Sequence, residues 1–193
     1  PTPLGFELKS LTVSLQVQDT TATAIQKRIT ISQNGETCYQ SHWSDFPNNQ
    51  FDLDLELLPR TRYEVLVEVR SDQDTARATS WFETGKMSEP WQGEWIAAPT
   101  EHANTVFSKA FTLAEADAQA RLYLTGLGVY EAYLDGEKIG DEFLAPGVTA
   151  YDCWVQVQTY PLNLNAGAHT LTVSVGDGWY KGNYGFDGGQ DHI

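Results

Sequence analysis

The feature of this sequence that most limits its fold is the repeated alternation of apolar and polar residues over short stretches. A period of two places successive side chains on opposite faces of an extended strand, so one face is buried and the other solvated. Strands of this kind form antiparallel sheets. Four stretches follow the pattern clearly, at residues 11–17, 51–57, 63–69 and 171–175. The alternation therefore predicts an all-β protein made of β-sandwiches.

Helix-forming composition occurs in one short stretch, residues 113–120, which read Leu-Ala-Glu-Ala-Asp-Ala-Gln-Ala. Eight residues without a wide apolar stripe are too few to hold a helix together. We expect a loop there, with at most one helical turn.

A change of pattern near residues 84–92 divides the chain. Strand-like residues 80–84 end at Gly85, residues 86–90 read as a linker, and Trp91 and Trp95 begin a new apolar block. The sequence therefore predicts two consecutive domains, residues 1–88 and 89–193.

The first domain contains a recognisable corner. Residues 57–63 follow the pattern Leu-x-Pro-x-Thr-x-Tyr and lead directly into an alternating strand. A proline fits where a strand begins, and a corner tyrosine can bury its ring while its hydroxyl reaches nearby backbone. This corner resembles that of fibronectin type III domains, which implies an immunoglobulin-like sandwich. An unrelated β-sandwich with a similar turn is the alternative.

The second domain contains two clear turns. Asp135-Gly136 lies between two strand-like stretches, and an Asp-Gly pair favours a two-residue hairpin because both positions need a positive φ. Residues 165–167, Asn-Ala-Gly, mark a turn before the stretch that ends at Val175. We expect a second β-sandwich here, of the jelly-roll (galactose-binding-like) type.

The charge balance excludes several classes of partner. The chain has 12 basic and 26 acidic residues, a net charge of −14, and most of the excess lies in the second domain. Nucleic acids and anionic membranes require basic surface, so neither is an expected partner. No apolar run approaches the roughly 18 residues that a membrane span requires.

The sequence contains no recognisable catalytic or metal-binding motif. The two cysteines and four histidines lack metal-ligand spacing, and residues 176–182 resemble a dinucleotide loop only superficially, because bulky aromatics fill it and no helix follows. Adjacent Asp141 and Glu142 are expected to point apart into solvent. We therefore predict no catalytic residue and no metal ligand.

The stretch from Gly176 to Gly189 is the best candidate for binding. It places aromatic residues among glycines, aspartates and an asparagine, a combination that can stack on sugar rings and bond their hydroxyls. The alternative is that these aromatics cover the end of the core. The candidate sugar-contacting residues are Asp177, Trp179, Tyr180, Asn183 and Tyr184.

Several motifs, in order along the chain, resemble the N-terminal region of bacterial α-L-rhamnosidases. Residues 3–6 and 82–85 are similar to the start and end of a fibronectin-like module that precedes the N-terminal sandwich of those enzymes. The motifs of that sandwich are similar to residues 91–97 (Trp-Gln-Gly-Glu-Trp-Ile-Ala), 107–111, 126–133, 144–151 and 176–182. Residues 160–164 depart from the usual pattern of the family.

The resemblance implies a part of a glycoside hydrolase that releases terminal L-rhamnose from glycosides or polysaccharides with inversion. It also implies that the catalytic carboxylates lie in an (α/α)₆ barrel outside these 193 residues. We therefore expect an accessory, non-catalytic region. The alternatives are a carbohydrate-binding module for rhamnose-containing glycans, with Ca²⁺ as its one conceivable cofactor, and a non-enzymatic interaction protein.

The resemblance also implies that the second sandwich continues past Ile193. We then expect unpaired backbone along an open edge, and with it self-association or a disordered tail beyond about Tyr184. Residues 1–6 do not have the pattern of a signal peptide, and two widely separated cysteines fit a reducing compartment. A bacterial cytoplasmic location is the expectation, with secretion or the periplasm as the alternative.

Overall fold

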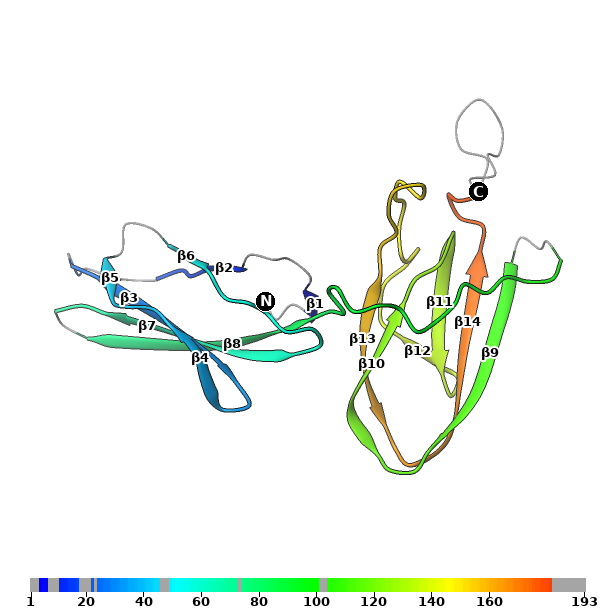
Figure 1. Ribbon diagram of the computed structural model, residues 1–193, viewed down its shortest axis with the longest axis horizontal. Coiled ribbons are helices and arrows are strands. Elements are labelled where there is room, and N and C mark those ends of the chain that lie inside the picture. The colour runs from blue at the N-terminus through cyan, green and yellow to red at the C-terminus, as the bar shows by residue number, and fades with distance from the viewer. Residues whose placement is uncertain are drawn as a thin grey trace. The chain divides into compact units, whose positions relative to one another are not determined.

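The computed structural model describes residues 4–6, 11–17, 22, 24–45, 49–72, 74–100 and 104–181. The chain divides into two compact units, Pro1–Gln92 and Gly93–Ile193, a few residues after the limit predicted from the sequence. Every regular element of the described residues is a β-strand (Figure 1). The predicted all-β fold, with one sandwich following another, is confirmed.

The described residues of the first unit form eight strands arranged in two sheets. A six-stranded sheet has the order β1-β8-β7-β3-β4, with β5 also paired to β3, and β2 and β6 form a second, two-stranded sheet. All pairs are antiparallel except β1 with β8, which is parallel. The strands are β1 (Leu4–Phe6), β2 (Leu11–Ser14), β3 (Gln26–Gln33), β4 (Glu36–Gln40), β5 (Ser44–Asp45), β6 (Gln50–Leu53), β7 (Arg62–Arg70) and β8 (Thr75–Thr84).

The core of the first unit joins its two sheets. Ile29 and Ile31 of β3 are completely buried, and the cluster extends across to the two-stranded sheet. Its buried members are Leu11, Ile29, Ile31, Phe51, Leu53, Leu57, Tyr63, Val65 and Phe82. Because they come from both sheets, this unit is a β-sandwich.

The corner before β7 has the structure that its sequence pattern predicts. The ring of Tyr63 is 2% exposed and stacks on Phe82, with 5.1 Å between ring centroids. The Tyr63 hydroxyl accepts a 2.9 Å hydrogen bond from the backbone N–H of Leu58. Thr84, completely buried, donates its hydroxyl to the Leu58 carbonyl at 2.6 Å and accepts from the Thr61 N–H at 2.8 Å. Two side chains therefore satisfy the backbone groups of this corner.

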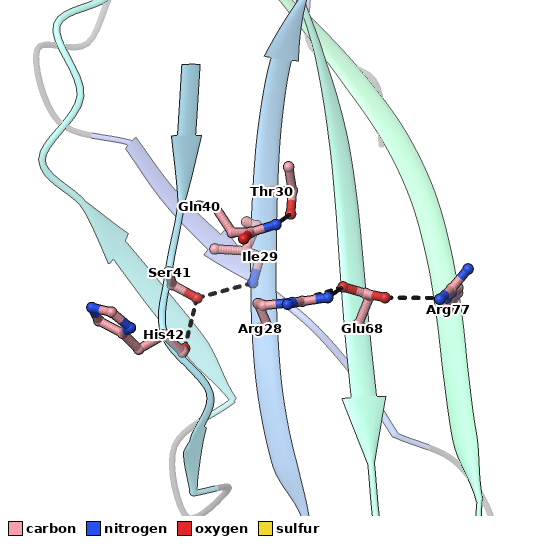
Figure 2. Close-up of polar contacts among 8 residues, drawn as sticks. All are labelled: Arg28, Ile29, Thr30, Gln40, Ser41, His42, Glu68 and Arg77. Carbon is pink, nitrogen blue, oxygen red and sulfur yellow. Dashed lines mark hydrogen bonds and ion pairs between the residues drawn. The ribbon is translucent and has the colours of Figure 1, made fainter. Parts of the chain in front are cut away.

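A charged cluster braces the outer side of the six-stranded sheet (Figure 2). The carboxylate of Glu68 on β7 lies between Arg28 on β3, whose Nε is 2.8 Å away, and Arg77 on β8, whose Nε is 3.1 Å away. The Glu68 side chain is only 5% exposed, so its charge is buried and has these two guanidinium groups as its partners. On the neighbouring strand segment, the Ser41 hydroxyl accepts from the N–H of Ile29 at 3.1 Å.

In the part of the second unit that the structure describes there are six strands, also in two sheets. A four-stranded antiparallel sheet has the order β12-β11-β14-β9, and β10 pairs with β13 in a two-stranded sheet. The strands are β9 (Asn104–Leu113), β10 (Asp117–Leu124), β11 (Val129–Leu134), β12 (Glu137–Ile139), β13 (Gln158–Leu164) and β14 (Gly167–Gly176). Pro161 is accommodated because β13 pairs only with β10 among the described strands.

The core of the second unit is smaller. Its buried cluster consists of Tyr130, Ala145 and Tyr160, with Leu122, Leu124, Ile139, Val173 and Val175 packed partly buried around it. The hydroxyls of Tyr130 and Tyr160 are 3.3 Å apart in the interior, and burial raises the pKa of both phenols. Members of this cluster come from both sheets, so the second unit is a sandwich as well.

One local prediction was wrong. Residues 117–120, expected in a loop with up to one helical turn, belong to strand β10, and the loop is limited to residues 114–116. Pairing with β13 outweighs the helical propensity of the alanines, and a register shift between Asp117 and Ala120 marks the adjustment. None of the described residues forms a helix long and apolar enough to span a membrane.

Candidate functional site

The candidate binding residues that the structure describes lie in the turn that follows β14. This turn begins at Asp177, whose carbonyl accepts from the N–H of Tyr180 at 3.1 Å and from that of Lys181 at 3.3 Å. One backbone carbonyl therefore closes the whole turn. Figure 1 shows the turn at the end of the second unit where the chain between β12 and β13 also lies.

Glycines seat this turn against the start of β11. A Cβ at Gly128, where φ is +113°, would lie 2.2 Å from the carbonyl oxygen of Gly176. A Cβ at Gly178, where φ is +51°, would lie 2.8 Å from the Cγ1 of Val129. Both positions therefore require glycine, which fixes the turn closely against its neighbour.

Tyr180 makes the contact that connects the turn to the chain between β12 and β13. Its ring meets that of Tyr151 edge-on, with 5.2 Å between centroids and 75° between planes. Tyr151 itself lies in a second tight turn, in which the N–H groups of Cys153 and Trp154 both bond to the Ala150 carbonyl, at 2.7 and 2.9 Å. Two segments far apart in sequence therefore meet through an aromatic pair.

Two hydroxyls in this region are buried without a hydrogen-bond partner among the described residues. They are the Tyr151 hydroxyl and the Thr149 Oγ1. Burial also raises the pKa of the Tyr151 phenol. Buried polar atoms normally have partners, so these are two groups to which a ligand or water could bond.

The candidate aromatics differ in exposure. Trp179 and Tyr180 are half-buried, so each offers part of its ring to solvent while the rest packs on the protein. Trp154, in the turn that holds Tyr151, is 56% exposed. Asn183 and Tyr184 lie outside the described residues, as does the rest of the chain after Lys181.

No three His, Cys, Asp or Glu side chains gather into a group that could hold a metal ion in the described part of the chain. Asp177 is the one acidic residue of the turn between Gly176 and Lys181. The calcium hypothesis therefore stays a prediction.

Comparison with known proteins assigns the unit that carries this site. Residues 115–193 match the family of α-L-rhamnosidase N-terminal domains. The second unit is an α-L-rhamnosidase N-terminal domain. An α-L-rhamnosidase from Streptomyces avermitilis is 40% identical over 114 residues, which are 56% of this chain and 11% of the relative. One from Formosa agariphila is 29% identical over 146 residues, 65% of this chain and 16% of the relative.

Solved rhamnosidase structures resemble the chain through both units. The α-L-rhamnosidase of Dictyoglumus thermophilum matches with a TM-score of 0.79 and 25% identity, over 97% of this chain and 25% of that one. The enzyme of Aspergillus terreus shares the fold, with a TM-score of 0.78 and 24% identity over 98% of this chain and 24% of its own. The chain thus spans less than a sixth of the length of the curated rhamnosidases above and about a quarter of these structures.

Three of the five residues predicted to contact sugar are described by the structure, and their role in binding stays a prediction. Asp177, Trp179 and Tyr180 do lie in one turn, as their adjacency in sequence requires. Tyr151 and Trp154 were missed as site residues because they lie in a loop remote in sequence. The aromatic pattern of residues 151–154, Tyr-Asp-Cys-Trp, was the signal available.

Proposed function

We propose that this chain is the accessory, non-catalytic N-terminal part of an α-L-rhamnosidase, and that a catalytic domain beyond it releases L-rhamnose from rhamnose-containing glycosides or polysaccharides. The match of residues 115–193 to the rhamnosidase N-terminal domain carries this proposal. The chain matches only a small share of each relative, so most of the sequence of those enzymes has no counterpart in this chain, which supports the proposal.

Two carboxyls of the second unit, those of Glu131 and Asp135, lack the electrostatics of a general acid. A glycosidase needs a general acid whose pKa is raised. Hydrogen bonds from Tyr133 and Lys138 lower the pKa of Glu131, and those from His169 and the Thr170 N–H lower the pKa of Asp135. Both carboxyls are thereby held as carboxylates, the opposite of what an acid catalyst requires.

The test is hydrolysis of a nitrophenyl α-L-rhamnoside by the rigorously purified chain, with a full-length α-L-rhamnosidase as the positive control. We expect no release of nitrophenol above the rate without protein. Turnover that copurifies with the chain and rises in proportion to its concentration would overturn the proposal.

A second candidate function is carbohydrate binding by the turn at Asp177–Lys181. The observation that favours it is the unpartnered Tyr151 hydroxyl beside Tyr180, because sugar hydroxyls can donate and accept at such a group. The half-exposed ring of Trp179 could stack on the apolar face of a sugar, and the Asp177 carboxylate could accept from its hydroxyls.

Calorimetric titration with L-rhamnose, with and without Ca²⁺, tests this second function. If the turn binds sugar, Trp179→Ala should lower the affinity by about 1–3 kcal/mol, the usual cost of losing an interface aromatic, and should change the melting temperature little. Trp95→Ala removes a 65% exposed tryptophan outside the turn and should leave affinity unchanged. Absence of heat with the wild-type chain would support a scaffolding role alone. Unfolding of Trp179→Ala would show that the ring belongs to the core.

We further propose a cytoplasmic location. Cys38 and Cys153 are both exposed and unpaired, which suits a reducing compartment. Fractionation of the native bacterium, with detection by antibody, tests this, and recovery from the periplasm or medium would contradict it.

A further inference from the structure

The imidazole of His169 has a hydrogen-bond acceptor at each of its two nitrogens. Nδ1 lies 2.6 Å from the Oδ2 of Asp135, and Nε2 lies 2.8 Å from the backbone carbonyl oxygen of Asn165. A neutral imidazole can donate only one hydrogen bond, whereas an imidazolium donates two. The geometry is therefore satisfied in full only when His169 is protonated.

The partner carboxylate is itself well held. While Oδ2 of Asp135 faces the imidazole, Oδ1 accepts from the backbone N–H of Thr170 at 2.7 Å. The backbone N–H of Asp135 in turn donates to the carbonyl of Thr170 at 2.9 Å. The His169 side chain is 10% exposed, whereas that of Asp135 is 45% exposed, so water reaches the clasp from the carboxylate side.

These contacts connect three separate pieces of backbone. Asp135, with a φ of 52°, and Gly136, with a φ of 86°, form the tip of the hairpin between β11 and β12. His169 lies near the beginning of β14, and Asn165 lies in the turn that precedes it. The group of Asp135, His169 and Asn165, here called the hairpin clasp, fastens the hairpin tip to β14.

The other charged groups near the hairpin clasp are few. On β9 the ring of Phe111 lies 5.5 Å from the imidazole, and Lys109 shares that face of the sheet two positions along. Glu137 follows the hairpin tip at the start of β12, and Asp117 on β10 pairs with Leu164, next to Asn165. Asp135 is the one carboxylate among them that bonds the ring.

We propose that the hairpin clasp is a protonation switch: protonated His169 fastens the tip of the β11–β12 hairpin to β14 through both ring nitrogens, and loss of its proton removes one of these contacts and loosens the tip. The neutral ring would leave one of its two acceptors facing an unprotonated nitrogen, so that contact is lost. Since the turn sequence Asp-Gly fixes the hairpin independently, release affects the docking of the tip and not the hairpin itself.

The direction of the pH dependence follows from the contacts. The Asn165 carbonyl and the Asp135 carboxylate raise the pKa of His169 above its ordinary value of 6.5, and the His169 and Thr170 donors lower the pKa of Asp135 below 3.8. The contribution of His169 is thus complete below about pH 6.5 and is lost as the pH rises through its folded-state pKa. The contribution of Asp135 to stability is lost only when the pH falls through the lowered pKa of its carboxyl.

The decisive variant is Asp135→Asn in the full chain. Asparagine is as well suited as aspartate to this turn, so the hairpin is retained while the negative charge is removed. Long-range ¹H–¹⁵N spectra of the imidazoles, recorded from about pH 5 to 9, report the protonation of each ring, and loss of one signal in His169→Gln assigns it. Asp141→Asn, an exposed carboxylate in the same unit, is the matched control.

We expect His169 to titrate above its ordinary pKa of 6.5, with a midpoint that falls in Asp135→Asn and is unchanged in Asp141→Asn. Hydrogen exchange at the amides of Asp135 and Thr170, corrected for its intrinsic pH dependence, should accelerate through that midpoint. A His169 midpoint at or below pH 6.5, or exchange that stays constant while His169 titrates, would overturn the proposal.

Discussion

Single polar side chains determine how the corner of the first unit is built. Tyr63 and Thr84 lie on neighbouring strands, and each bonds backbone groups of residues 58–61 that the sheet leaves unpaired. A buried backbone group without a partner costs about 1–3 kcal/mol, so these hydroxyls matter more for the corner than their small size suggests.

We therefore expect Tyr63→Phe to destabilise the first unit by about 1–2 kcal/mol, because the ring packing on Phe82 is kept while the N–H of Leu58 loses its acceptor. Urea unfolding, monitored by hydrogen exchange of the amides of β3 and β7, measures the change. Tyr39→Phe is the control, since Tyr39 packs partly buried against the same core cluster. Equal stability of the two variants would contradict the prediction.

At the scale of elements, Glu68 connects three strands. Its carboxylate contacts Arg28 on β3 and Arg77 on β8, on either side of its own strand β7. Removing the charge leaves the two guanidinium groups without their counter-charge, Arg28 partly covered and Arg77 largely exposed.

Glu68→Gln should lower the free energy of unfolding of the first unit by about 1–3 kcal/mol, less than for a fully buried pair because Arg77 is largely exposed. Chemical denaturation of the two variants side by side measures it. Glu64→Gln, on the same strand and exposed, should change stability by no more than about 0.5 kcal/mol. A Glu68→Gln variant as stable as this control would show that the brace contributes nothing.

Which elements could be foreseen depends on how local their causes are. The Asp135-Gly136 hairpin and the Tyr63 corner were predicted because their turn chemistry lies in consecutive residues. Residues 117–120 were misassigned because their strand exists through pairing with β13, about which their own composition says nothing.

In the candidate site, too, the features with local causes could be predicted and those that depend on distant contacts could not. The turn of Asp177 and Tyr180 could be read from its glycines and aromatics. The contact of Tyr180 with Tyr151 could not, since it depends on how the loop after β12 is held. That loop is anchored where Ala145 accepts from the N–H of Tyr130 at 2.7 Å, a bridge between apolar residues without a sequence signal.

At the scale of the whole molecule, the open edge expected from the sequence has a candidate in β9. Among the described strands, this ten-residue strand ends the order of its sheet, pairs with β14 without a register shift and carries one charge, Lys109. Sheet edges of this length are usually blunted by charges, prolines or bulges. The opposite edge, β12, has only three residues.

We expect the chain to self-associate through β9, more strongly at higher salt, because screening weakens the repulsion between chains of net charge −14. Light scattering over a series of salt and protein concentrations measures this. Val106→Glu, at an exposed position of β9, should suppress association. A chain that stays monomeric at every concentration and salt would refute it.

The pairing of β9 with β14 also determines when each unit can be completed on the ribosome. All the described strands of the six-stranded sheet are available once β8 has left the ribosome, because β8 pairs with both β1 and β7. β9 has no partner until residues 167–176 have been made, although it is the first strand of its unit. Since domains fold largely as units during synthesis, the nascent chain passes through a stage with a finished first sandwich and a second one still unpaired. The second unit is therefore the part of this protein that most needs protection from premature contacts during translation.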